Sequence, residues 1–324
     1  MAVPNIILLK GISKSYSKKK VLQNVELDIQ KGEIFGIIGM SGSGKTTLLE
    51  ILIGFQRPDT GDVLFLDNGD YKSVFKGQSR VKQLFGFAAQ APSFYEKLTV
   101  EENLRYFGTM YGLSEKRIRE NINKLLPLVG LTDERDSIAD ELSGGMQKRL
   151  DIACAMIHGP DVLILDEPTA DLDIVLRKQI WDLVKRINSV GTTVIISSHF
   201  LQELESICYR IAIINKRTTT MVGKVSELRE KYTRLSEIIV HTRPGKYAAV
   251  IKSLLDKNVA ISRHALHGTD LILSVEDPEP VLHQLIHVLE AHKEFLVNIE
   301  VKKPSLDEIF ESIAEKTAKE LNIK

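Results

Sequence analysis

One short stretch constrains the fold of this 324-residue chain more than any other. Residues 34–55 read IFGIIGMSGSGKTTLLEILIGF. The apolar run at the start is typical of a buried strand, and the apolar spacing after residue 46 is typical of a helix. Between them, residues 39–46 match the pattern G-x-x-x-x-G-K-[ST]. A strand, a glycine-rich loop and a helix in this order predict a phosphate-binding loop inside an α/β fold.

The chemistry of this loop predicts a bound nucleotide with Mg²⁺. Its glycines allow backbone N–H groups to surround a phosphate, and the start of the following helix adds positive potential. Lys45 is expected to reach the β- and γ-phosphates, and the hydroxyl of Thr46 to coordinate Mg²⁺. The residues predicted to bind the nucleotide here are Gly39, Met40, Ser41, Gly42, Ser43, Gly44, Lys45, Thr46 and Thr47.

A second motif, VLILDEP at residues 162–168, supplies carboxylates that fit such a site. Asp166 ends a predicted buried strand, where a carboxylate needs a strong partner, and Mg²⁺ is one. The alternative role of Asp166, as a cap for the next helix, is less favoured beside a phosphate loop. Glu167 can orient or deprotonate a water molecule in line with the γ-phosphate.

Strand patterns made of unbroken Ile, Val and Leu alternate with helical patterns, which predicts a parallel sheet covered on both faces. Helical patterns alone fill residues 99–157, so we expect an inserted helical subdomain at about 91–158. The sheet strands are expected at residues 34–38, 84–90, 162–167, 192–198 and 210–215.

A charged segment near residues 225–235 marks a domain boundary. We expect a P-loop NTPase core over residues 1–225 and a second, smaller domain over residues 226–324. The patterns of the second domain follow the order β-α-β-β-α-β, with one more helix at the end. This order predicts a ferredoxin-like α+β domain, to which we assign an accessory or regulatory role.

Composition excludes several other classes of protein. Lys and Arg total 43, and Asp and Glu also total 43, so no basic field predicts nucleic acid as a partner. No apolar stretch approaches the roughly 18 residues of a membrane span, and the start MAVPNIILLK has no signal-peptide pattern. Cys154 and Cys208 lie in apolar helical patterns and are expected to be buried free thiols of a cytoplasmic protein.

Further motifs, in their order along the chain, resemble those of the ATP-binding cassette (ABC) ATPase family. Gln90 follows a predicted strand, and His199 ends the strand pattern TTVIISSH. LSGGM at residues 142–146 is similar to the family signature LSGGQ. ADLD at residues 170–173 is similar to the family's D-loop. The resemblance covers residues 1–225 and implies an ATPase that uses ATP and Mg²⁺.

The resemblance also implies that each site is shared between two chains, which are either two copies of this chain or this chain and a sister ATPase. In the family, two nucleotide-binding domains meet head to tail, and the signature of each contacts the nucleotide held by the other. It implies catalytic roles for Glu167, His199 and Gln90, a metal contact from Gln90, and stacking of adenine on Tyr16. The residues implied to contact the partner's nucleotide are Ser143, Gly144, Gly145 and Met146. Because ADP lacks the γ-phosphate, nucleotide state would set dimer state.

Two residues depart from the family pattern. Met146 stands where Gln is common, but the backbone donors of the signature survive this change, so we expect activity to survive as well. Asp171 stands where the D-loop commonly has a small residue. We favour a neutral surface variation at Asp171 over an altered coupling between the two sites.

A membrane permease is the partner that the family resemblance implies. The surface expected to bind it is residues 90–108, where Phe94 and Tyr95 are either aromatic docking residues or core residues of the helical subdomain. KKPSLDEIF at residues 302–310 and the run LTVEENLRYFGTMYGL are similar to ATPase subunits of ABC-2-type drug and polysaccharide exporters. An exporter subunit at the cytoplasmic face of a membrane is therefore the leading interpretation. The alternatives are an importer subunit and an ABC ATPase that drives a non-transport assembly.

Overall fold

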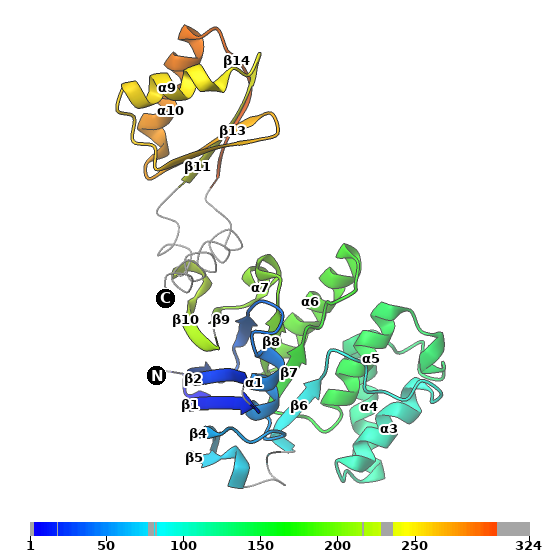
Figure 1. Cartoon of the computed structure of the whole chain (residues 1–324). Coiled ribbons are helices and arrows are strands. Elements are labelled where there is room, and N and C mark those ends of the chain that lie inside the picture. The colour runs from blue at the N-terminus through cyan, green and yellow to red at the C-terminus, as the bar shows by residue number, and fades with distance from the viewer. Residues whose placement is uncertain are drawn as a thin grey trace. The chain divides into compact units, whose positions relative to one another are not determined.

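The computed structural model describes residues 3–17, 19–76, 81, 83–215, 217–227 and 236–302 (Figure 1). They belong to two compact units, unit 1 (Met1–Val225) and unit 2 (Ser226–Lys324), and each unit is considered by itself. None of the helices within these described ranges is long and apolar enough to cross a bilayer.

Unit 1 is built on a six-stranded sheet that is parallel except at one edge. Its last strand in sequence pairs antiparallel with its neighbour, and all other pairs are parallel. In spatial order the strands are β10 (Thr218–Lys224), β9 (Arg210–Asn215), β3 (Ile34–Ile38), β8 (Thr193–Ser198), β7 (Val162–Asp166) and β6 (Phe85–Ala88). Every residue of the central strands β3, β8 and β7 is buried, which explains their unbroken apolar sequences.

A second, antiparallel sheet covers one face of the first, with helix α1 (Lys45–Leu52) between them. Its strands, in spatial order, are β2 (Lys19–Gln30), β1 (Asn5–Tyr16), β4 (Thr60–Asp67) and β5 (Asp70–Ser73), followed by the 3-10 turn η1 (Val74–Lys76). Leu48 and Leu49 of α1 pack in one core with Phe65 of β4 and Ile195 of β8. This separate sheet was not predicted from the sequence, because an alternating pattern marks a strand without specifying its partner.

Helices α6 (Ile174–Ser189) and α7 (Leu201–Ile207) complete the unit beyond the parallel strands. Leu204 of α7 packs on β3 so closely that a Cβ on Gly36 would lie 3.1 Å from its methyl carbon. Cys154 and Cys208 are buried and free, and burial raises the pKa of both thiols.

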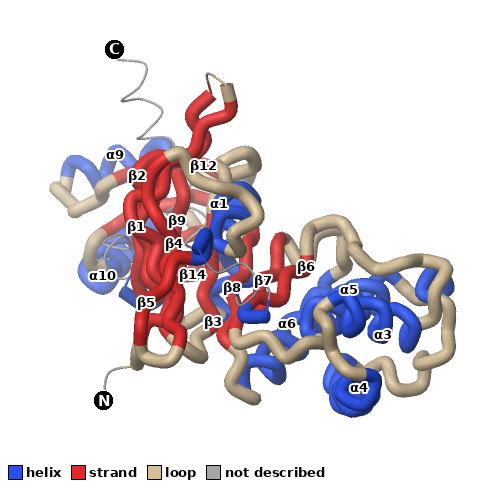
Figure 2. The backbone as a smooth tube through the Cα atoms, turned by 90° about the horizontal axis from the view of Figure 1, so that it is seen from below, coloured by secondary structure: helices blue, strands red, loops and turns tan. Residues whose placement is uncertain are grey.

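Three helices form the inserted segment, and they lie beside β6 at one end of the parallel sheet (Figures 1 and 2). They are α3 (Val100–Met110), α4 (Glu115–Val129) and α5 (Gly144–Met156), with the 3-10 turn η2 (Ala139–Glu141) before α5. Each helix begins at a hydroxyl residue, Thr99, Ser114 or Ser143, whose oxygen accepts a backbone N–H of the first turn. Gly130 ends α4 with a left-handed φ of 67°.

Unit 2 follows the β-α-β-β-α-β order. Its elements are β11 (Ser236–Arg243), α9 (Tyr247–Asp256), β12 (Arg263–His267), β13 (Asp270–Val275), α10 (Pro278–Ala291) and β14 (Phe295–Lys302). The antiparallel sheet has the order β12-β13-β11-β14, and Val240 and Leu273 on one face pack against Val250 and Leu285 of the two helices. The helix predicted after β14, with residues 303–310 of the KKPSLDEIF segment, lies outside the described residues.

Glu294 joins the end of β11 to the start of β14 in unit 2. Its side chain is buried, and its carboxylate accepts hydrogen bonds from the hydroxyl of Thr242 (2.7 Å) and from the N–H groups of Gly245 (2.8 Å) and Lys246 (2.7 Å). Burial raises the pKa of Glu294, but the three hydrogen bonds outweigh it, so the pKa lies below its ordinary value. The ionised carboxylate therefore stabilises the folded unit.

We expect Glu294→Gln to destabilise unit 2 by about 1–3 kcal/mol at pH 7, since an amide cannot accept all three hydrogen bonds. Because the folded-state pKa is lowered, this stabilisation is present above the unfolded-state pKa of about 4.3. It is lost as the pH falls through the folded-state pKa. Hydrogen exchange of β11 amides, corrected for intrinsic rates, should show wild type and variant converging as the pH falls from 7 to 3.

The matched control is Glu276→Gln, a carboxylate in the exposed loop after β13, which should change β11 exchange little at any pH. A Glu294→Gln difference that keeps its full size at pH 3 would contradict this account of the carboxylate.

Candidate functional site

A polar cavity of about 540 Å³ lies at the edge of the sheet where the parallel strands end. Because β3, β6, β7 and β8 run in the same direction, the residues that follow them meet there. Most of the residues predicted to bind phosphate, metal and water therefore line one space. Its lining residues are Val21, Ser41, Gly42, Gly44, Lys45, Thr46, Thr47, Gln90, Glu167 and His199.

The loop between β3 and α1 folds tightly against itself. A Cβ on Gly39 would lie 2.3 Å from Oγ of Ser43 and 2.8 Å from the carbonyl oxygen of Ile214, so a larger residue cannot fit. Gly44 precedes α1 with a φ of 102°, a conformation that residues with a side chain rarely adopt. The backbone itself therefore requires glycine at these two positions, and the start of α1 stays open to the cavity.

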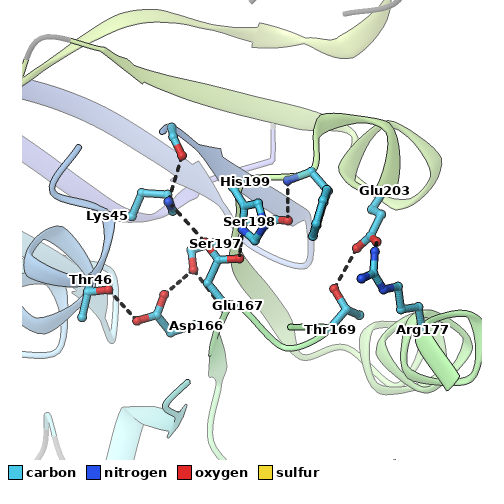
Figure 3. A network of polar contacts seen from close by, with 12 residues as sticks. Lys45, Thr46, Asp166, Glu167, Thr169, Arg177, Ser197, Ser198, His199 and Glu203 are labelled. Carbon is cyan, nitrogen blue, oxygen red and sulfur yellow. Dashed lines mark hydrogen bonds and ion pairs between the residues drawn. The ribbon is translucent and has the colours of Figure 1, made fainter. Parts of the chain in front are cut away.

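Lys45 places its cation between the loop and the end of β7. Its side chain is nearly buried, and Nζ donates a hydrogen bond to the carbonyl oxygen of Gly39 at 2.8 Å. Nζ also lies 3.2 Å from Oε1 of Glu167. Figure 3 marks this ion pair with a dashed line. From this position the ammonium group can bind a phosphate oxygen that lies in the cavity.

Asp166 and Thr46 form a pair of oxygen ligands. Asp166, the last residue of β7, is 2% exposed, and its Oδ2 accepts a hydrogen bond from the Thr46 hydroxyl at 2.8 Å. Its Oδ1 accepts one from the hydroxyl of Ser197 on β8 (Figure 3). Carboxylate and hydroxyl oxygens are hard donors of the kind that Mg²⁺ prefers, and a Mg²⁺ ion takes few ligands from protein when phosphates supply the rest. The two side chains fit that ion.

Glu167 is held in a strained backbone conformation next to this pair. Its φ is 48°, in the left-handed region that costs a residue with a side chain about 1–3 kcal/mol. Its N–H donates to Ser197, with the hydroxyl oxygen at 3.0 Å and the carbonyl oxygen at 3.2 Å. Its Oε2 lies 2.8 Å from Nδ1 of His199. The carboxylate thus lies between the cation of Lys45 and the imidazole of His199.

Gln90 lines the cavity from a loop that α5 holds on both sides. Lys148 donates to the carbonyl oxygen of Ala89 at 3.1 Å, and Asp151 accepts from both N–H and hydroxyl of Ser93 at 2.9 and 2.7 Å. Burial lowers the pKa of Lys148 and raises that of Asp151. The sequence did not single out Lys148, Asp151 or Ser197, because their roles depend on neighbours from distant segments.

Tyr16 lies at the end of β1 and is exposed, with its hydroxyl bonded to the side chain of Gln56. It does not line the cavity, although Val21 on β2 does. Stacking of adenine on Tyr16 therefore stays a prediction.

The signature segment lies apart from the cavity. Ser143 begins α5, where its hydroxyl accepts the N–H of Met146, and none of the residues described as lining the cavity comes from residues 143–146. A Cβ on Gly145 would lie 2.7 Å from Leu176 in the first turn of α6. The start of α5 therefore lies beside the first turn of α6, which follows the D-loop, and away from the phosphate loop of its own chain.

A separate apolar cavity of about 660 Å³ lies between the residues that follow α1, strand β6 and helix α3 of the inserted segment. Its lining includes Phe55 and Met110, which are 79% and 69% exposed, together with Phe107. Of the two aromatic residues predicted for docking, Tyr95 is exposed and packs on Tyr106, but Phe94 is buried. Phe94 therefore belongs to the core of the inserted segment and not to a docking surface.

Comparisons with known proteins agree with this geometry. A family model described as ABC transporter matches residues 22–170. The linearmycin resistance ATP-binding protein LnrL of Bacillus subtilis is 31% identical over 96% of this chain and 99% of its own length. The daunorubicin/doxorubicin resistance ATP-binding protein DrrA of Streptomyces peucetius is 31% identical over 93% of this chain and 89% of its own.

Solved structures share the fold of unit 1. The protein cbiO1 from Clostridium perfringens, titled part of the ABC transporter complex cbiONQ, is 26% identical. It has a TM-score of 0.63 and covers 71% of this chain and 94% of its own. The α/β prediction and the family resemblance are confirmed. This chain belongs to the ABC transporter ATP-binding proteins, and it is an ATPase of that family.

Proposed function

We propose that two copies of this chain hydrolyse ATP between them, head to tail, and thereby drive a separate membrane permease that exports its cargo. The observation that supports this proposal most strongly is that the signature segment lies apart from the cavity. The cavity holds Lys45, Glu167 and His199, but the described residues that line it include none from residues 143–146. A second copy is the source that can supply them.

Each residue of the cavity has a proposed task in hydrolysis. Lys45 and the N–H groups at the start of α1 bind the β- and γ-phosphates. Thr46 and Asp166 hold Mg²⁺, with Gln90 as a further ligand, and the bound ion neutralises phosphate charge. Glu167 orients or deprotonates the attacking water. Because Nδ1 of His199 faces Glu167, we assign the other ring nitrogen to the γ-phosphate.

The second copy contributes its signature segment to the γ-phosphate. The first residues of α5 have backbone N–H groups without an acceptor inside the helix, and its positive dipole end suits an anion. Residues Ser143, Gly144, Gly145 and Met146 have no lysine among them, and the Lys45 of the other copy makes one unnecessary. Because ADP has no γ-phosphate, the paired state binds ATP more tightly than ADP. Hydrolysis of ATP to ADP therefore separates the two copies.

Export through a permease is supported by the relatives and by the apolar cavity. LnrL and DrrA are named for drug resistance, and other relatives near 30% identity are named Nod factor export ATP-binding proteins. The cavity lined by Phe55, Phe107 and Met110 offers an apolar site for a helix of the permease at the cytoplasmic membrane face. An importer subunit or a non-transport ATPase would share the hydrolytic site but differ in this partner.

Replacing Glu167 with Gln should reduce ATP turnover by roughly 10²- to 10⁴-fold, since the amide cannot take a proton from water. ATP affinity, measured with a fluorescent analogue, should change by less than about threefold because Lys45 and the loop remain. Asp182→Asn, a change on α6 outside the cavity, is the matched control. Near wild-type turnover by Glu167→Gln would remove Glu167 from its assigned role.

The solution mass of Glu167→Gln should report the shared site. With Mg²⁺ and ATP we expect a dimer, because hydrolysis is blocked and the γ-phosphate remains to hold both copies. With Mg²⁺ and ADP we expect a monomer. A monomer under both conditions, with ATP demonstrably bound, would contradict pairing of this chain with itself.

Met110→Glu should weaken binding of the chain to its permease while sparing basal ATPase activity. The new charge would lie in the apolar cavity, and Met110 is exposed enough for folding to tolerate it. Co-sedimentation with inside-out membrane vesicles from the source cells should fall at least about tenfold. Val190→Glu, an equally exposed apolar position outside the cavity, is the control. Unchanged sedimentation of Met110→Glu would contradict docking at this cavity.

A further inference from the structure

Two charged side chains outside the nucleotide cavity connect the D-loop to the segment that carries His199. Arg177 belongs to the second turn of α6, and Glu203 belongs to α7, which begins just after His199. Figure 3 shows both side chains between the two helices, beside Thr169. Neither residue lines the cavity, so the proposed hydrolytic roles leave both unexplained.

Arg177 contacts three different segments at once. Its Nε donates to the carbonyl oxygen of Leu172 in the D-loop at 2.8 Å. Its Nη1 donates to Oε1 of Glu203 at 2.8 Å. The guanidinium also lies over the ring of Phe200, 4.7 Å from its centroid, and that ring packs at 3.9 Å on the imidazole of His199. One planar cation therefore holds the D-loop, α7 and the neighbour of His199 together.

Glu203 closes the same network from the other side. Its second oxygen, Oε2, accepts a hydrogen bond at 2.7 Å from the hydroxyl of Thr169, two residues after Glu167. The segment from Thr169 to Leu172 is thus fixed at both ends by one ion pair. Asp171 within this segment has a left-handed φ of 62°, which only Asn, Asp and Gly adopt readily. The D-loop is therefore held in one defined conformation.

The network also reaches the signature segment. Leu176, the neighbour of Arg177, approaches Gly145 so closely that a Cβ there would lie 2.7 Å from it. The first turns of α6 thus contact both the D-loop and the signature segment, which faces the second copy in the proposed pair. The same turns contact Phe200, and through it His199. Partly exposed ion pairs contribute little to folding stability, so stability alone does not account for this arrangement.

We propose that Arg177 is a positioning residue that couples contact with the second copy to the orientation of His199 in the chain's own site. This inference rests on the proposed head-to-tail pair and assigns a regulatory link within it. Movement of the D-loop would shift the Leu172 carbonyl, the guanidinium and the Phe200 ring together. His199 would then take its hydrolytic orientation when the second copy is in place.

The test is a double-mutant cycle between Arg177 and His199 in the full chain. Arg177→Met should lower kcat about tenfold or more while changing KM for ATP less than about threefold. In a His199→Ala background, where some residual turnover is expected, the same change should lower kcat by less than about twofold, because the residue it acts through is absent. Lys178→Met, at the exposed neighbouring position on α6, should leave kcat unchanged in both backgrounds.

Two further variants separate coupling from simple charge pairing. Arg177→Lys keeps a cation for Glu203 but cannot donate to Leu172 and cover the Phe200 ring in the same way. We expect it to restore less than about half of the lost kcat. Equal losses from Arg177→Met with and without His199, or full activity of Arg177→Lys, would overturn the proposal.

Failure of the proposed pair is distinguishable from failure of this coupling. In the Glu167→Gln background, Arg177→Met should still form the ATP-dependent dimer, because it removes no residue that contacts nucleotide. If Glu167→Gln itself stays monomeric with ATP, the head-to-tail pair is wrong. If it dimerises and the cycle is additive, the pair stands and the role of Arg177 is wrong.

Discussion

The parallel pairing of β3, β8 and β7 is the constraint on which the site depends. Each strand ends at the same edge of the sheet, and each is followed by polar residues. Asp166 at the end of β7 accepts hydrogen bonds from Ser197 of β8 and from Thr46 of α1, the helix that follows β3. Without this order, the phosphate loop, the metal carboxylate and His199 would come from unrelated parts of the surface.

The same geometry explains why one chain carries two helix starts suited to anions. The start of α1 opens into the cavity and has Lys45 beside it. The start of α5 belongs to the inserted segment and packs against Leu176 of α6. The described residues that line the cavity include none from this helix start. In the proposed function each helix start serves one side of the same phosphate group. This arrangement makes hydrolysis depend on association.

Much of the fold was predictable because strands buried on both faces of a parallel sheet have unbroken runs of apolar residues. IFGII, VLILD and TVIISS were all placed correctly, and the loop after each carried its own chemical motif. The antiparallel sheet of β1, β2, β4 and β5 was not predicted, since alternation does not specify which strands pair. Ser197, Lys148 and Arg177 were missed for a related reason: their roles come from partners more than four residues away. The roles assigned to individual site residues stay predictions until variants are measured.

Complementation between two inactive variants tests the central claim most directly. Lys45→Ala removes the phosphate cation and Ser143→Arg blocks the signature, so each variant alone should be inactive at both of its shared sites. In a mixture, half of the dimers pair one variant with the other and keep one intact site. We expect ATP hydrolysis to return to on the order of a quarter of the wild-type rate. A mixture as inactive as either variant alone, with both variants folded, would contradict a site shared between two copies.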